Sequence, residues 1–249
     1  MSITVAPIGH SRILAVGTYR PKRVVPNSEI VDRIDSTDEW IVQRTGIESR
    51  RFAGDDESVI SMAKAACEMA LQRAKLTMTD IDTVILSTIS YPFQAPSAAT
   101  ELINELGNPK AAAFDISAAC AGFCYGIAMG SDLVRSGTSK NVLVIGVEKL
   151  SDYTDPDDRA TAFIFADGAG AVVIGQSDQP RIAQTIWGSD ADSRDAIMLT
   201  PSFLDFKKNP DKGVSQLGWP NISQQGQVVF RWAVYSMSKV GLKALDAAG

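Results

Sequence analysis

The segment from Phe114 to Tyr125 places one cysteine, Cys120, between a strand-like run and a helix-like run. Upstream, residues 111–116 form a short apolar run after a Gly-Asn-Pro breaker, which predicts a buried strand. Downstream, apolar residues recur at roughly helical spacing: Phe123, Ile127, Met129, Leu133 and Val134. Cys120 therefore lies at a predicted helix N-terminus.

The position of Cys120 at a predicted helix N-terminus suits a nucleophile. Unpaired backbone N–H groups and the positive end of the helix dipole stabilise a thiolate there. Small residues flank the cysteine and leave room for a substrate close to the backbone: Ser117, Ala118, Ala119, Ala121 and Gly122. The alternative is a buried core cysteine, because free cysteine is among the most buried residue types. The residues alone leave both interpretations open.

Strands and helices alternate along the rest of the chain. The patterns predict strands over residues 12–19, 83–88 and 141–147, and helices over 58–75 and about 97–106. Ser36 is a good N-cap for a further helix that begins near Thr37 and ends before Gly46. Residues 163–165 and 169–174 are expected to form a hairpin about Asp167-Gly168, a favoured two-residue turn.

Composition and charge narrow the function classes. The chain has 249 residues, of which 45% are hydrophobic and 21% charged, and a net charge of −5. This balance argues against a nucleic-acid-binding protein, which would normally carry a clustered basic excess. No apolar run reaches the length of a transmembrane helix and no signal sequence is evident, so we expect a cytoplasmic protein that does not bind a membrane.

Cysteine and histidine counts argue against metal chemistry. Three cysteines fit reduced thiols better than a disulfide framework. Cys120 and Cys124 are four residues apart, but His10 is the only histidine and there is no second cysteine pair. We therefore expect no metal site.

Residues 226–248 show an amphipathic helical pattern with a period near 3.6. This segment is similar to the predicted helix over 58–75, since both contain alanine and methionine and carry a lysine near the middle. The similarity favours two repeated halves. The alternative is two unrelated surface helices.

Three motifs together resemble β-ketoacyl-acyl-carrier-protein synthase III. They are Ser-Ala-Ala-Cys-Ala-Gly-Phe around Cys120, Asp-Glu-Trp-Ile-Val-Gln-Arg-Thr-Gly-Ile over 38–47, and Asp-Arg at 158–159 leading into Ile-Phe-Ala-Asp-Gly-Ala-Gly-Ala over 164–171. The match runs from about Arg12 to the last residue, and residues 55–58 and 230–233 look closest to actinobacterial members.

The resemblance implies a fold, a reaction and partners. The fold is α/β, the thiolase-like αβαβα layered structure of two similar halves, usually a homodimer. Residues 1–178 would be the N-terminal half, and residues 179–249 a linker and the incomplete start of the second half. The family starts type II fatty-acid synthesis: a cysteine takes an acyl group from acyl-CoA, and the acyl-enzyme condenses with malonyl-acyl carrier protein, releasing carbon dioxide. Acyl-CoA is a substrate, and no cofactor is implied.

Site residues carry over by position. Cys120 would be the acylated nucleophile, with its backbone N–H in the oxyanion hole. Trp40 matches an adenine-stacking tryptophan, although a tryptophan among charges is commonly a packed anchor. Arg44 and Arg159 match arginines that hold the nucleotide end of CoA, where a guanidinium suits phosphate. Their alternative role is pairing with nearby acidic residues on the surface.

Two further segments match with less detail. Residues 94–97, which begin with Gln94, resemble the loop that shapes the acyl pocket. Gly226 and Phe230 match a segment that lines the pantetheine tunnel, although Gln227 differs from the asparagine of some relatives.

The chain departs from the family pattern at two catalytic positions. The family histidine of a His-Gln-Ala-Asn motif and a later asparagine stabilise the enolate formed by decarboxylation, and neither motif is in these 249 residues. His10 lies outside the motif and is not assigned the role. We therefore expect these residues alone to lack condensing activity and to be part of a longer enzyme. Alternatives are another thiolase-fold acyltransferase, such as a polyketide starter or hydroxymethylglutaryl-CoA synthase-like enzyme, or a non-catalytic acyl-CoA-binding module.

Overall fold

A five-stranded mixed sheet organises the chain. The computed structural model describes residues 8–249. The strand order is β1 (His10–Tyr19), β7 (Asp167–Ser177), β6 (Asn141–Lys149), β4 (Thr83–Ser87) and β5 (Ala112–Ile116). Strand β4 pairs in parallel with both β5 and β6, whereas β7 runs antiparallel to β6 and β1. The carboxyl ends of the three parallel strands therefore meet at one edge of the sheet.

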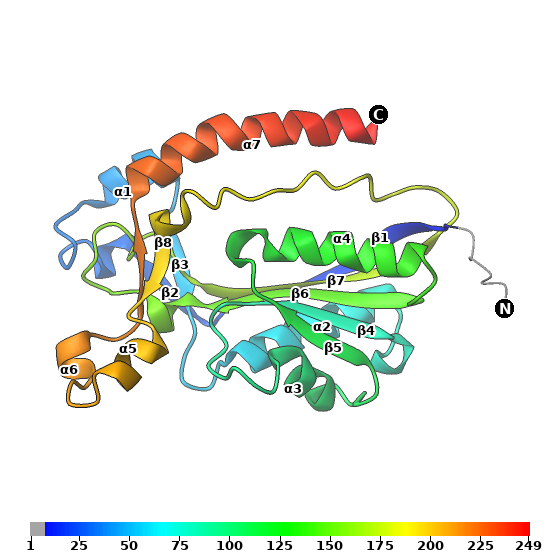
Figure 1. Cartoon of the computed structure of the whole chain (residues 1–249), viewed down its shortest axis with the longest axis horizontal. Coiled ribbons are helices and arrows are strands. Elements are labelled where there is room, and N and C mark those ends of the chain that lie inside the picture. Colours follow the sequence, from blue (N-terminus) through cyan, green and yellow to red (C-terminus); the bar gives the residue numbers. More distant parts are fainter. Residues whose placement is uncertain (1–7) are drawn as a thin grey trace.

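Both faces of the sheet are buried, which explains the continuous apolar runs of its strands. Successive residues of a strand point to opposite faces, so Val84 and Leu86 enter one core while Ile85 enters the other. The first core lies under α2 (Val59–Ala74) and α3 (Ala98–Glu105), and the second lies under α4 (Gly122–Arg135). Figure 1 shows α4 on the opposite side of the sheet from α2 and α3.

Helix α2 confirms the expectation for residues 58–75. Ser58 caps its N-terminus in a capping box with Ser61, and Lys75 ends it in the left-handed conformation. Eight of its side chains are buried against the sheet.

Small residues make up most of the face that α4 turns to the sheet. Gly122, Gly126 and Gly130 lie there with Val134, while Phe123 and Ile127 are half-buried and pack against the same core. A Cβ at Gly126 would lie 2.7 Å from Val144 Cγ1, so the helix packs too close to β6 for a side chain there. The apolar spacing predicted the helix and missed this small-residue face.

Helix α1 (Asp38–Thr45) lies beside a two-stranded ribbon of β2 (Arg23–Pro26) and β3 (Ser49–Phe52). Its N-cap is Thr37, whose hydroxyl accepts from the Trp40 amide, one residue later than the Ser36 we predicted. Gly46 ends the helix with a φ of +70°, as predicted. A short 3₁₀ turn, η1 (Asn27–Glu29), joins β2 to the segment that leads into α1.

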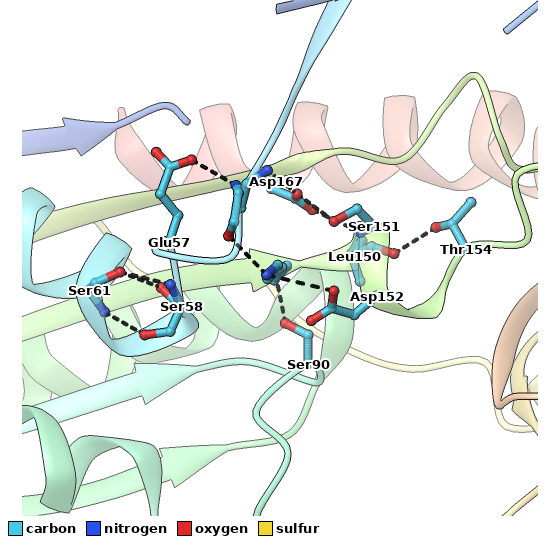
Figure 2. A network of polar contacts seen from close by, with 12 residues as sticks. Glu57, Ser58, Ser61, Ser90, Leu150, Ser151, Asp152, Thr154 and Asp167 are labelled. Carbon is cyan, nitrogen blue, oxygen red and sulfur yellow. Dashed lines mark hydrogen bonds and ion pairs between the residues drawn. The ribbon is translucent and has the colours of Figure 1, made fainter. Parts of the chain in front are cut away.

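The hairpin expected about Asp167-Gly168 is wrong. Residues 163 and 164 lie in a turn, residue 165 belongs to no helix, strand or turn, and Asp167 is the first residue of the long strand β7. Its buried carboxylate accepts from the Ala53 amide (2.7 Å) and from the amide and hydroxyl of Ser151 (2.8 and 2.6 Å). Figure 2 shows this contact beside the segment Leu150–Thr154. Asp167 thus ties distant segments together instead of making a local turn.

The remaining elements follow a long connection after β7. They are β8 (Ile197–Thr200), α5 (Phe203–Lys208), α6 (Val214–Leu217), β9 (Asn221–Gln224) and α7 (Gly226–Ala248), with β8 and β9 paired antiparallel. The helix expected over 226–248 is confirmed, and none of its side chains is buried within residues 8–249. The division into halves at residue 178 stays a prediction.

A buried carboxylate, Glu57, predicts pH-dependent stability. It accepts from the Gly54 amide (2.8 Å) and the Tyr19 hydroxyl (2.6 Å), and these bonds hold the pKa of the Glu57 carboxyl below its usual range. We expect Glu57→Gln to lower the melting temperature at neutral pH. Because the folded pKa is depressed, the wild-type advantage is full above the ordinary value of about 4.3 and is lost as pH falls through the folded value.

Thermal melts from pH 7 down to pH 3 measure this difference. Glu68→Gln, on the exposed side of α2, is the matched control and should shift the melting temperature little at any pH. A Glu57→Gln deficit that stays constant across this range contradicts the assignment.

Candidate active site

Cys120 lies in the turn between β5 and α4, as predicted. It is the middle residue of a 3₁₀ turn, η3 (Ala119–Ala121), which runs directly into α4. Ala119 has a φ of +44°, a left-handed conformation that is unfavourable for a residue with a side chain. The backbone is thus held in an uncommon conformation immediately before the cysteine.

The exposure of Cys120 argues against the core interpretation. Cys120 is exposed, whereas Cys67 on α2 is fully buried. Burial raises the pKa of the Cys67 thiol, so that thiol stays protonated at physiological pH. The chain therefore holds one inert core thiol, Cys67, and two exposed ones, Cys120 at the turn and Cys124 on α4.

Cys120 lines a cavity of about 340 Å³ at the carboxyl ends of the parallel strands. Its walls come from the end of β4 (Ser87), the end of β6 (Glu148), the start of α4 (Phe123) and the start of β7 (Gly168). The chain leaves β4 for α3 on one face and leaves β5 for α4 on the other. Such a divergence is the usual place for ligands in open α/β sheets.

Gly122 lets α4 begin directly against β4. A Cβ at this position would lie 1.9 Å from Ser87 Oγ and 3.0 Å from Ser87 Cβ. Both residues are buried. The close approach fixes where the helix starts, and hence where Cys120 is held relative to the cavity.

Glu148 is a functional-site candidate that the sequence interpretation missed. Its carboxylate accepts from the Ile89 amide (2.9 Å) and from the hydroxyls of Ser90 (2.5 Å) and Thr88 (3.2 Å). Burial raises the pKa of the Glu148 carboxyl, and these hydrogen bonds oppose that rise. The available signal was an acidic residue directly after the apolar run over 141–147.

Lys149 extends the polar network away from the cavity. Its amide donates to Ser90 Oγ (2.8 Å), and its ammonium contacts the Gly54 carbonyl (3.3 Å) and Asp152 (3.7 Å). Figure 2 shows these contacts joining the segment after β4 to the segment before α2. The carboxyl ends of β4 and β6 are thereby fastened together.

Trp40, Arg44 and Arg159 are brought together, as their predicted shared role requires. The guanidinium carbon of Arg44 lies 4.3 Å from the centroid of the Trp40 ring, and that of Arg159 lies 5.3 Å from it. Arg159 also contacts Asp35 (3.7 Å). Two guanidinium cations against one aromatic ring favour a ligand that carries both an aromatic group and negative charge. The two cations repel each other, and a bound anion relieves this repulsion.

Gly226, Phe230 and His10 do not line the Cys120 cavity. Gly226 begins α7, and Phe230 is 72% exposed one turn later. Their role along a pantetheine tunnel stays a prediction. His10 starts β1 opposite Ser177, beside the amino end of β6, whereas the cavity is at the carboxyl end of that strand. His10 therefore cannot act as a base for Cys120 in this fold.

Neither a metal cluster nor a membrane span adds to this site. Within residues 8–249, no three histidine, cysteine or acidic side chains gather in a way that could hold a metal ion. No helix in the same range is both long and apolar enough to cross a lipid bilayer.

Comparison with known proteins supplies the family. Residues 114–191 match the family model described as 3-oxoacyl-[acyl-carrier-protein] synthase III. The chain is 51% identical over 240 residues to the β-ketoacyl-[acyl-carrier-protein] synthase III of Streptomyces glaucescens, a match that covers 96% of this chain and 71% of the relative. This chain belongs to the β-ketoacyl-[acyl-carrier-protein] synthase III family.

Solved structures agree with the family assignment. The priming β-ketosynthase of the R1128 polyketide pathway matches with a TM-score of 0.95 and 40% identity, over all of this chain and 73% of that one. The synthase III of Pseudomonas aeruginosa PAO1 matches with a TM-score of 0.84 and 32% identity, over 96% of this chain and 71% of that one. The predicted α/β thiolase-like fold and the actinobacterial resemblance are confirmed.

Proposed function

We propose that this synthase III family member starts fatty-acid synthesis by transferring an acyl group from acyl-CoA to Cys120 and condensing it with malonyl-acyl carrier protein. The observation that carries the proposal is the exposed Cys120 at a strand-to-helix turn, lining a cavity. Family membership supports an acyltransferase of this kind. Acyl-CoA enters as a substrate, and the reaction needs no bound cofactor.

The first step exchanges one thioester for another. Cys120 Sγ forms a bond to the acyl carbonyl carbon, the bond from that carbon to the CoA sulfur breaks, and the Cys120 proton ends on the released CoA thiol. We propose that the Cys120 backbone N–H stabilises the oxyanion of the tetrahedral intermediate. The left-handed turn at Ala119 supports this role, since it presents the start of η3 to the cavity.

The test of the nucleophile is intact mass after incubation with a panel of acyl-CoAs. We expect one acyl adduct on the wild type and none on Cys120→Ser. Cys124→Ser is the matched control, because Cys124 is also exposed on α4 but does not line the cavity. An adduct that persists in Cys120→Ser overturns the proposal. Acyl-CoA binding without any adduct on the wild type would instead indicate a non-catalytic binding module.

The nucleotide end of CoA is proposed to bind at Trp40, with its phosphates on Arg44 and Arg159. Stacking of a base on an aromatic ring is worth about 1–3 kcal/mol. We therefore expect Trp40→Ala to slow Cys120 acylation by acyl-CoA about ten-fold or more and to leave acylation by acyl-pantetheine, which has no nucleotide, unchanged.

Trp187→Ala is the control for this prediction, because Trp187 is exposed and packs on Tyr125 instead. An equal loss with both thioesters in Trp40→Ala would show that the ring serves folding and not nucleotide binding.

The remaining partners are also proposals. We propose that the second substrate is malonyl-acyl carrier protein, that the protein acts as a homodimer and that it works in the cytoplasm. Release of carbon dioxide from malonyl-acyl carrier protein, by an acylated enzyme that includes the family histidine and asparagine, tests the first; these 249 residues alone are expected to release none. Sedimentation equilibrium tests the second, and cell fractionation tests the third.

A further inference from the structure

Arg50, on β3, buries a guanidinium without a direct acidic partner within residues 8–249. Arg50 is only 6% exposed, and burial lowers the pKa of its guanidinium. Its donors meet carbonyl and amide oxygens only, and its Nε has no partner among the described residues. A buried cation with no adjacent carboxylate is unfavourable for folding, which makes Arg50 a candidate for a functional role.

One arm of this guanidinium reaches α1 through Asn27. Arg50 Nη2 donates to Asn27 Oδ1 (2.5 Å), and Asn27 is only 1% exposed. The Asn27 Nδ2 donates in turn to Asp38 Oδ1 (2.6 Å) and to the Ile47 carbonyl (2.8 Å). Asp38 is the first residue of α1 and Ile47 follows its end. The network therefore holds both ends of the helix that carries Trp40.

The same nitrogen also reaches the wall that supports the Trp40 ring. Arg50 Nη2 also lies 3.4 Å from the Phe163 carbonyl. The Phe163 ring is buried and meets Trp40 edge to face, with centroids 5.4 Å apart and an interplanar angle of 85°. The Arg50 guanidinium thus contacts both the residue that anchors α1 and the residue whose ring packs against Trp40. The Trp40 ring lies between Arg44 and Arg159.

We infer that Arg50 is a positioning residue for thioesters that carry a nucleotide: through Asn27 and the Phe163 carbonyl it fixes the Trp40 ring between the two arginines. This inference rests on the proposed binding of CoA at Trp40. Arg50 does not line the Cys120 cavity, so its effect should be confined to the nucleotide end of the substrate. Lysine cannot reproduce the forked donors that contact three acceptors at once.

The experiment compares Cys120 acylation rates in Arg50→Lys with acyl-CoA and with the matching acyl-pantetheine. Because ångström-scale misplacement of binding groups can cost up to about 10²-fold in rate, we expect a loss of roughly ten-fold or more with acyl-CoA. The rate with acyl-pantetheine should stay within about two-fold of wild type, since it does not use the displaced groups. Arg51→Lys is the matched control on the same strand, because among the described residues Arg51 donates only to the Pro21 and Lys22 carbonyls. It should alter neither rate.

Equal losses with the two thioesters in Arg50→Lys, or no loss with either, overturn the inference. Should Arg50→Lys fail to fold, Asp38→Asn at the exposed start of α1 weakens the same network and should lower the acyl-CoA rate alone by several-fold. Trp40→Ala separates the two proposals. If it lowers the acyl-CoA rate selectively and the Arg50 and Asp38 variants do not, only the positioning role fails. If it has no selective effect, the nucleotide site itself fails.

Discussion

Gly122→Val should reduce Cys120 acylation by about 10²-fold or more while the protein still folds. Any side chain at residue 122 meets the end of β4, since even a Cβ would lie 3.0 Å from Ser87 Cβ. Rotation of the Ser87 hydroxyl relieves the 1.9 Å contact with its oxygen but leaves that to its Cβ. The start of α4 must therefore move away from β4 and carry Cys120 with it, and misplacement by about 1 Å can cost about 10²-fold in rate.

The rate of adduct formation by intact mass measures this effect, with circular dichroism as the check of folding. Gly122→Ala should show a smaller loss in the same direction. Gly241→Val is the matched control, because Gly241 is also helical but a Cβ there would meet nothing within 4 Å. Wild-type acylation by Gly122→Val would show that the start of α4 does not position the cysteine.

Gly17→Ala should destabilise the fold by about 3 kcal/mol, the upper part of the usual range for overpacking a core. A Cβ on this β1 residue would lie 2.0 Å from the Ala66 carbonyl oxygen and 2.5 Å from the Ala70 amide nitrogen. Both atoms belong to the backbone of α2, so no side-chain rotation relieves the contact. Helix α2 must move away from the sheet and loosen the core beneath it.

Urea unfolding followed by circular dichroism measures the free energy of unfolding. The matched control is Gly170→Ala, on β7 directly opposite Thr18, where a Cβ meets no atom within 4 Å. It should change the free energy of unfolding by less than about 1 kcal/mol. A Gly17→Ala protein as stable as wild type would contradict the close packing of α2 on β1.

Local patterns in the sequence predicted the elements that depend on local physics. The apolar runs over 83–88 and 141–147 became β4 and β6, and the helix expected over 58–75 became α2. The Asp167-Gly168 turn was wrong because the Asp167 carboxylate binds amides more than 15 residues away in sequence. A contact between residues so far apart cannot be predicted from the few residues around Asp167, so Asp167-Gly168 was interpreted as an ordinary hairpin turn.

The site was predictable to the extent that its residues are close in sequence. Trp40 and Arg44 are four apart on one helix, so their contact follows from helical spacing. Glu148 and Arg50 were missed because they stand out only through the burial of their charged groups, and a sequence pattern does not show that burial. An acidic residue near the end of a strand and an arginine in a short ribbon are normally solvated, and only the packed fold buries the Arg50 guanidinium and partly buries the Glu148 carboxylate.

The residues that line the cavity and the residues that stabilise the sheet occupy different parts of the same strands. Ser87, Cys120 and Glu148 stand at or beyond the exits of three neighbouring strands, while the apolar residues of those strands fill the cores. Side chains at these exits that take no part in the contacts of Glu148 and Lys149 can therefore change with little effect on the sheet. Under the proposed function, a change in acyl-group preference needs substitutions only at such positions and leaves the two cores intact.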